Sequence, residues 1–85
     1  RSSDLYIISE HYREIAEAIM EQMGRGVTSL EARGMYSDQE KKMLFCVVSK
    51  KEIVRLKEIV AEFDSSAFVI VSDAREVFGE GFIEY

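Results

Sequence analysis

The chain has 85 residues, enough for one small domain with a modest hydrophobic core and too few for two domains. Apolar residues make up 47% of it and there is no proline, low-complexity tract or linker, so a disordered protein is excluded. No apolar run approaches the roughly 18 residues that a membrane-spanning helix needs, and the N-terminus lacks the pattern of a signal peptide. One cysteine and one histidine exclude an internal disulfide framework and leave too few ligands for a zinc site, which favours a reducing cytoplasm.

The net charge of −5 is unevenly distributed. Residues 25–57 hold eight Lys and Arg side chains against four acidic ones, a local charge of +4, so the two ends together carry −9. A basic middle between acidic ends indicates either an anionic ligand or complementary faces in an oligomer, while solvated faces of alternating sign are the plainer alternative. The acidic total argues against nonspecific binding to nucleic acid.

The first part of the chain predicts a strand and then a helix. Residues 5–8 form a short apolar run typical of a strand. Ser9 is the expected N-cap of the helix, and Gly24 is its expected C-cap. One apolar stripe recurs at helical spacing and is expected to face the core: Tyr12, Ile15, Ala16, Ile19, Met20 and Met23.

The middle of the chain predicts a β-hairpin. Residues 27–35 alternate in polarity but are only partly apolar, as in an edge strand or a curved strand. Residues 36–40 are polar and turn-like, and residues 42–48 are almost continuously apolar, as in the centre of a sheet.

The last part predicts a helix, a strand and a short helical tail. Ser49 and Glu52 have the spacing of a capping box, which satisfies two amides at a helix start. The helix that follows has a clear apolar stripe: Ile53, Leu56, Ile59, Val60 and Phe63. Residues 64–66 break this helix, residues 67–71 form a second strong strand, and 73–76 repeat the capping-box spacing before the tail.

The predicted order is strand, helix, strand, strand, helix, strand, then the tail. Two such halves with right-handed crossovers make an α+β, ferredoxin-like βαββαβ sandwich, in which a four-stranded antiparallel sheet carries both helices on one face. The other face is left open, and either the apolar tail or a second subunit is expected to cover it.

The segment 24–36 is the candidate ligand site. It joins a helix end to a strand with glycines and arginines, so backbone amides and basic side chains are expected to gather in one anion-binding corner. A helix C-cap and a strand-entry turn explain the same glycines without any ligand. The candidate residues are Gly24, Arg25, Gly26, Thr28, Arg33, Gly34 and Tyr36.

Four residues near the C-terminus are secondary candidates. Asp73 and Glu76 are interpreted as a helix cap, although Asp73 is also suited to a cation or a ribose. Gly79 and Gly81 flank a tail that either closes over a ligand or simply ends the last helical turn.

No catalytic or metal site is predicted. His11 has no second histidine or cysteine nearby in sequence, and Cys46 lies inside an apolar strand where nothing adjacent would lower its pKa. No nucleophile, base and orienting group can be assembled from these motifs, so the chain is not expected to be an enzyme.

Several runs of sequence carry a family resemblance that covers nearly the whole chain: 24–28, 34–36, 44–52, 56–60 and 67–82. Together they resemble the C-terminal cytoplasmic domain of the YitT-type bacterial membrane proteins, whose biochemical function is not established. The resemblance implies one domain, residues 1–85, cut from the C-terminal end of a longer protein with N-terminal transmembrane helices.

The sequence departs from the usual pattern of that family in three places. Ala32 stands where Gly is common, Ser37 and Asp38 where Thr-Gly is common, and Ser65 and Ser66 where Asp-Pro is common. A looser similarity, in the order of segments and the Gly-x-Thr start of the second strand, links the chain to the PII-type signal proteins. Those proteins are ferredoxin-like and trimeric and bind adenine nucleotides between subunits.

These features predict a non-catalytic regulatory module on the cytoplasmic side of the cell membrane. It is expected to form a homo-oligomer, as a dimer or a trimer, and to sense a small anionic ligand such as a nucleotide for the attached membrane domain. The alternative is a structural self-association domain that binds no ligand. The sequence names no cofactor and predicts no metal.

Overall fold

The computed structural model describes residues 2–73, 77–79 and 82–84. Its strands and helices follow one another as β1 (Ser2–Ile8), α1 (Tyr12–Met23), β2 (Thr28–Arg33), β3 (Glu40–Ser49), a 3₁₀ turn (Lys50–Glu52), α2 (Ile53–Phe63), β4 (Phe68–Asp73), β5 (Val77–Gly79) and β6 (Phe82–Glu84). Within this described part of the chain, neither helix is long and apolar enough to cross a bilayer.

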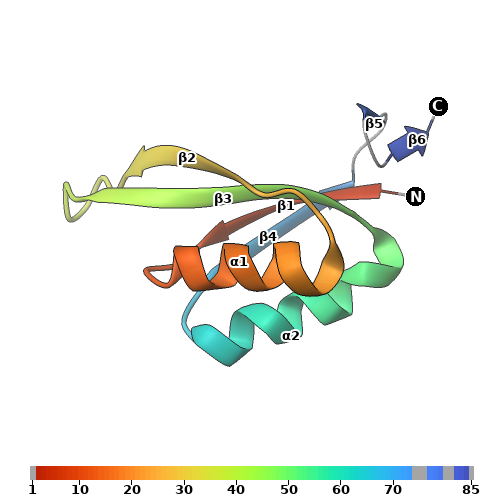
Figure 1. Cartoon of the computed structure of the whole chain (residues 1–85). Helices are drawn as coiled ribbons and strands as arrows, with labels where there is room; N and C mark the ends of the chain where they lie inside the picture. The colour runs from red at the N-terminus through yellow and green to blue at the C-terminus, as the bar shows by residue number, and fades with distance from the viewer. Residues whose placement is uncertain (1, 74–76, 80–81, 85) are drawn as a thin grey trace.

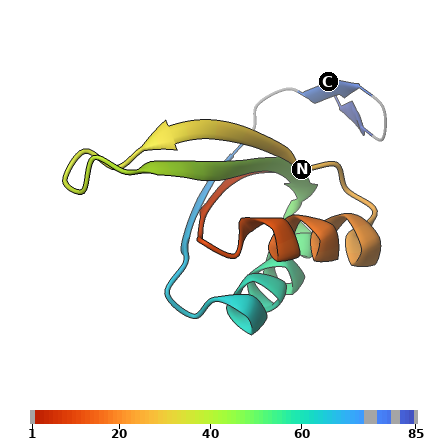
Figure 2. The same ribbon diagram turned by 60° about the vertical axis from the view of Figure 1, so that its left-hand side comes forward.

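Four strands form one antiparallel sheet in the order β2-β3-β1-β4. Figure 1 shows both helices beneath this sheet, and Figure 2 shows the same single-sided arrangement after a turn. The predicted ferredoxin-like sandwich is therefore confirmed. Every strand is antiparallel to its neighbours, so the end of β1 lies beside the starts of β3 and β4, with Ile8 opposite both Met43 and Phe68.

The core lies between the sheet and the helices. Alternate residues of β1 and β3 point into it, and they meet three buried side chains from each helix: Leu5, Ile7, Leu44, Cys46, Val48, Ile15, Ala18, Ile19, Leu56, Ile59 and Val60. The predicted stripes are mostly confirmed. Met20 and Phe63 are the exceptions, because they are 45% and 37% exposed, whereas Ala18, which was not predicted, is buried in the core.

The predicted start of α1 was wrong. The helix begins at Tyr12 after an N-cap at His11, and Ser9 lies outside it. The Ser9 hydroxyl instead accepts a hydrogen bond from the His11 amide (2.9 Å) and donates one to the Asp64 carboxylate (2.6 Å). Ser9 therefore links the turn before α1 to the turn after α2, a long-range role that a local capping pattern does not reveal.

The other helix ends follow the sequence prediction. Gly24 ends α1 in the left-handed conformation, with φ of 67°, and its amide donates to the Met20 carbonyl. The capping box at Ser49 and Glu52 is present, although the chain makes a 3₁₀ turn before α2 begins. The Ser49 amide donates to the Glu52 carboxylate at 2.8 Å.

The predicted helical tail was also wrong. Residues Val77–Gly79 and Phe82–Glu84 pair as two short antiparallel strands. Asp73 cannot cap a helix, because it continues β4 and is paired with Ser3 across the sheet. Figures 1 and 2 show this small hairpin standing off the end of the sheet near the N-terminus, so it does not cover the open face.

Candidate functional site

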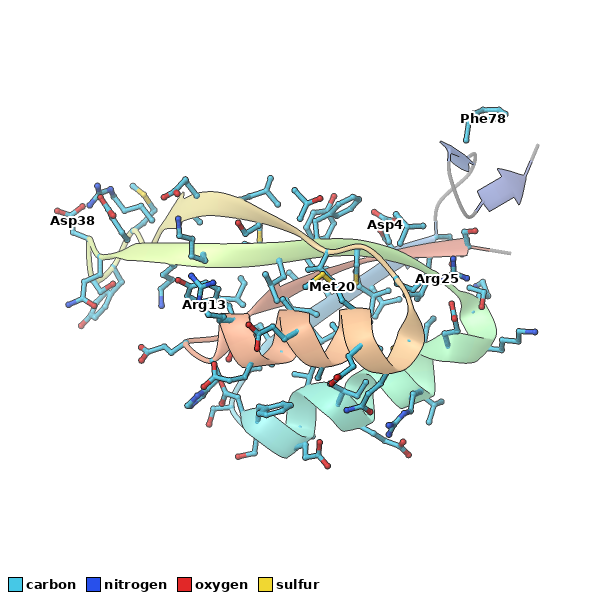
Figure 3. All side chains as sticks on the ribbon, viewed as in Figure 1. Asp4, Arg13, Met20, Arg25, Asp38 and Phe78 are labelled. Carbon is cyan, nitrogen blue, oxygen red and sulfur yellow. The ribbon has the colours of Figure 1, made fainter. Side chains whose placement is uncertain are left out.

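The structure divides the predicted anion corner between the two ends of β2. Gly24, Arg25 and Gly26 precede this strand, whereas Arg33 ends it and Gly34 and Tyr36 follow it. Six strand residues separate the two groups by about 17 Å. Figure 3 shows Arg25 at one end of the sheet and Asp38, in the loop after Arg33, at the other. The expected gathering of both arginines in one corner does not occur.

At the first end, Arg25 binds the capping box of α2. Its Nε donates to Glu52 Oε1 at 3.1 Å, and both side chains are largely buried. The same Glu52 oxygen accepts hydrogen bonds from the Ser49 amide and hydroxyl. Partial burial alone would raise the pKa of Glu52, but these hydrogen bonds and the Arg25 charge outweigh it and lower the pKa. Arg25 therefore joins the α1–β2 connection to the start of α2.

Asp73 reaches the same end of the sheet from β4. Its carboxylate accepts a hydrogen bond from Lys50 Nζ at 2.8 Å. Thr28 begins β2 opposite Phe45, on the face turned away from the helices. Gly79 belongs to β5, whereas Glu76 and Gly81 lie outside the described residues.

At the second end, Arg33 is held by the loop that it enters. Its guanidinium donates to the Asp38 carbonyl at 2.9 Å and lies 3.6 Å from the carboxylates of Asp38 and Glu40. Both arginines of the predicted site are thus paired with acids, Arg25 with Glu52 and Arg33 with Asp38 and Glu40.

The described residues form a cleft elsewhere, with a volume of about 610 Å³. It lies where β1 ends and where β3 and β4 begin, beneath the part of the β2–β3 hairpin that extends past β1. Its lining residues come from sequence-distant segments and none was predicted as a site residue: Ile8, Ser9, Glu10, His11, Tyr12, Glu31, Gln39, Glu40, Lys41, Lys42, Asp64, Ser66 and Phe68. This volume falls in the range of small-molecule sites.

The cleft combines apolar, hydroxyl and charged groups. Asp64 accepts hydrogen bonds from the Ser9 hydroxyl and from the Ser66 amide (2.9 Å), and these lower its pKa. Lys42 is paired with Glu31, a hydrogen bond that raises the pKa of the lysine. Phe68 offers an aromatic face on the rim, with 70% of its surface exposed. The wall could therefore contact a flat ring and a polar group of one small molecule.

Nothing in the described part of the chain assembles a catalytic centre. Burial raises the pKa of the Cys46 thiol to about 11, so the thiolate is disfavoured at neutral pH. His11 lies 3.9 Å from Glu14 in an exposed pair. Among the described residues, no three His, Cys, Asp or Glu side chains are grouped to hold a metal ion.

The second surface feature is the sheet face turned away from the helices, here called the open face. The strand register places one set of apolar side chains on it: Tyr6, Ile8, Leu30, Met43, Phe45, Val47, Phe68 and Ile70. The Tyr6 and Phe45 rings pack together with centroids 5.0 Å apart. Asp4, Thr28 and Ser72 lie toward one end of the face.

Comparison with known sequences identifies the family. Residues 25–79 match the family described as "Uncharacterized protein conserved in bacteria (DUF2179)". The chain belongs to this family. It is 46% identical over 82 residues to the UPF0750 membrane protein YvjA of Bacillus subtilis (strain 168), and 34% identical over 73 residues to YitT of the same strain. The resemblance to YitT-type proteins is confirmed.

These relatives are much longer than the chain. The alignments cover 96% of this chain but 29% of YvjA, and 86% of this chain but 26% of YitT. The DUF2179 chain thus corresponds to about a quarter of each of these membrane proteins.

Solved structures support the fold. A DUF2179 protein from Eubacterium ventriosum has a TM-score of 0.75 at 33% identity, over 85% of this chain and 99% of that one. A protein of Thermus thermophilus described as PII-like has a TM-score of 0.63 at 22% identity, over 84% of each chain. CPII of Thiomonas intermedia, solved with ADP, AMP and acetate, has a TM-score of 0.62 at 18% identity, over 82% of this chain and 81% of its own. The last two likenesses establish the shared fold only.

The Arg25–Glu52 contact gives the first testable prediction, the substitution Glu52→Gln. The glutamine keeps an acceptor for the Ser49 amide but removes the charge that Arg25 contacts. A carboxyl whose pKa is lowered by folding stabilises the protein above its unfolded value of about 4.5, and this contribution disappears as the pH falls through the folded value. The variant should lose about 1 kcal/mol of stability at pH 7 and progressively less below pH 4.5.

Chemical denaturation from pH 3 to pH 7 measures this difference. The matched control is Glu62→Gln, an exposed glutamate on α2. If the difference in unfolding free energy between Glu52→Gln and the parent does not change between pH 3 and pH 7, the charged contact does not contribute to stability.

Proposed function

We propose that this domain is a non-catalytic assembly module, through which copies of a longer membrane protein associate by packing their open faces together. The single observation that carries the proposal is the open face itself. Apolar side chains from all four strands lie on it, and no helix or strand of the described chain covers them. Polar groups lie toward one of its ends, as they do at the rim of a protein interface.

The exposed area supports a subunit rather than a self-sufficient monomer. The chain exposes 6044 Å², whereas a compact monomer of 9.8 kDa would expose about 5,200 Å². The excess is comparable with the roughly 800 Å² that one partner contributes to a standard interface.

The relatives suggest what such an assembly would join. YvjA and YitT are membrane proteins of which this domain would form about a quarter. In the proposal the domain lies on the cytoplasmic side of the membrane. Its association holds neighbouring membrane subunits together as a dimer or trimer.

Sedimentation velocity at tens of micromolar tests the assembly, with Ile70→Asp as the disrupting variant. Ile70 is 48% exposed at the open face, so a single chain tolerates the change, but an interface would have to bury an unpaired carboxylate. The parent should sediment as an oligomer, and the variant should raise the dissociation constant at least 100-fold.

The matched control for this experiment is Val54→Asp. Val54 is 67% exposed on α2, remote from the open face, so its variant should assemble like the parent. A parent protein that sediments only as a 9.8 kDa species would end the assembly proposal.

A second candidate function is sensing a small ligand in the cleft, whose lining holds four carboxylates and two lysines: Glu10, Glu31, Glu40, Asp64, Lys41 and Lys42. Two observations favour it: the cleft has a ligand-sized volume, and the similarly folded CPII was solved with ADP, AMP and acetate. Ile8 and Phe68 belong both to the cleft and to the open face, so assembly would bring a second subunit to the rim of the cleft. Ligand binding and association would then be coupled, which is the basis of a sensor.

Thermal shift with AMP, ADP, ATP and acetate tests the second candidate. A ligand at 100 times its Kd adds about 2.7 kcal/mol of stability. Lys41→Ala should weaken binding about 10- to 100-fold, because a charge-assisted contact is lost, whereas Lys57→Ala on α2 should not. If none of these ligands raises the melting temperature, the second candidate is rejected and only the assembly proposal remains. If the melting temperature rises and only Arg25→Ala or Arg33→Ala abolishes the rise, the ligand binds at an end of β2 and not in the cleft.

A further inference from the structure

The tip of the β2–β3 hairpin carries two of the most exposed large side chains in the described part of the molecule. Met35 is 89% exposed, and Tyr36 is exposed as fully as in an extended peptide, at 105%. Single exposed apolar residues are ordinary, but these two are adjacent and both lie wholly in water. Neither residue is buried by the rest of the described domain, so both are available for a contact outside it.

The hairpin holds the tip away from the body of the domain. β1 ends opposite Met43, so the pairs formed by residues 31–33 with residues 40–42 extend past it without a third strand. Figures 1 and 2 show this ladder projecting beyond both helices. Glu31 pairs with Lys42 across it, and Arg33 lies 3.6 Å from Glu40, which brace the two strands.

The loop at the tip is itself ordered by hydrogen bonds. The Gly34 amide donates to the Gln39 carbonyl (2.9 Å), and the Asp38 amide donates to the Gly34 carbonyl (2.7 Å). The loop packs closely at Gly34, where a β-carbon would lie 2.9 Å from Ser37 Oγ and 3.0 Å from Lys41 Cε, both of them side-chain atoms that can move aside. Met35 and Tyr36 are therefore presented by a preorganised loop, which reduces the entropy that binding would cost.

Charge indicates what kind of surface the tip fits. Residues 31–42 hold three basic and three acidic side chains, so the hairpin has no net charge to attract anionic lipid or nucleic acid. Tyrosine and methionine are enriched in the centres of protein interfaces. The partner surface is thus an apolar pocket on a protein.

Affinity decides between a free and a tethered partner. Burying two side chains supports a dissociation constant of about 1 mM or weaker, which is too weak for a freely diffusing protein. A partner in the same polypeptide has an effective concentration on the order of millimolar when the linker is short. The relatives carry about three quarters of their length outside this domain and are membrane proteins.

We propose that Met35 and Tyr36 dock in an apolar pocket of the membrane-embedded part of the same longer protein. The hairpin then transmits the state of the cytoplasmic domain to the membrane domain. This inference rests on the proposed attachment to a membrane domain, but it does not require assembly through the open face.

Photo-crosslinking in the longer protein, in its native membrane, tests the docking. A benzophenone side chain replaces Tyr36, and the control position is Val54, exposed on α2. Mass spectrometry should find cross-links from position 36 to peptides of the membrane domain, at least ten times more abundant than from position 54. The substitution Met35→Ser should reduce them severalfold.

Other outcomes overturn the proposal. Cross-links only to the same domain of a second copy would make the tip part of the assembly, and cross-links only to lipid or to other proteins would reject the tethered pocket. A yield no higher than that from position 54 would also reject it. If the longer protein fractionates as a soluble protein, the membrane attachment fails and the docking fails with it.

The fold itself is not at risk in this test. Met35→Ser and Tyr36→Ser in the 85-residue domain should leave its melting temperature within about 3 °C of the parent, as usual for exposed substitutions. A larger loss would show that the tip serves the stability of the hairpin instead, and would overturn the docking role.

Discussion

A four-stranded sheet has two faces, and residues 2–73, 77–79 and 82–84 supply helices for only one of them. Because side chains alternate along a strand, burying Leu5 and Ile7 against α1 and α2 forces Tyr6 and Ile8 onto the opposite face. Those residues are apolar as well, and so are their neighbours on β3 and β4. The small β5–β6 hairpin stands away from the sheet. The proposed assembly through the open face rests on this alternation rather than on any single motif, and it would place the cleft beside the boundary between subunits.

Local signals in the sequence were sufficient for most of the fold. The capping box at Ser49, the left-handed cap at Gly24 and the apolar stripes predicted both helices and their order among the strands. Two predictions failed because tertiary pairing overrode a local pattern. Ser9 hydrogen-bonds to Asp64, 55 residues away, and Asp73 is held in β4 by its pairing with Ser3. The apolar residues of the tail suit a strand as well as a helix, and only their mutual pairing decides between the two.

The candidate site was harder to predict for a geometric reason. Arg25 and Arg33 are close in sequence, but the extended strand between them spans about 17 Å. Residues at opposite ends of one strand are therefore far apart in space. The cleft has the opposite character, since residues from β1, β3 and the turn before β4 meet there although they are far apart in sequence. The antiparallel order of the sheet already implied that these strand ends coincide. The side chains that line the cleft, and the full exposure of Met35 and Tyr36, required the three-dimensional structure.

The most direct test of the central claim is the solvent exposure of open-face methyl groups in the assembled protein, measured by NMR with a soluble paramagnetic probe. Ile8, Met43 and Val47 report on the open face, Ile15 reports on the buried core, and Val54 reports on an exposed helix surface. The account predicts that the open-face methyl groups relax nearly as slowly as those of Ile15, while Val54 relaxes quickly. Relaxation of Ile8, Met43 and Val47 that is no slower when the protein is concentrated than when it is dilute would contradict it.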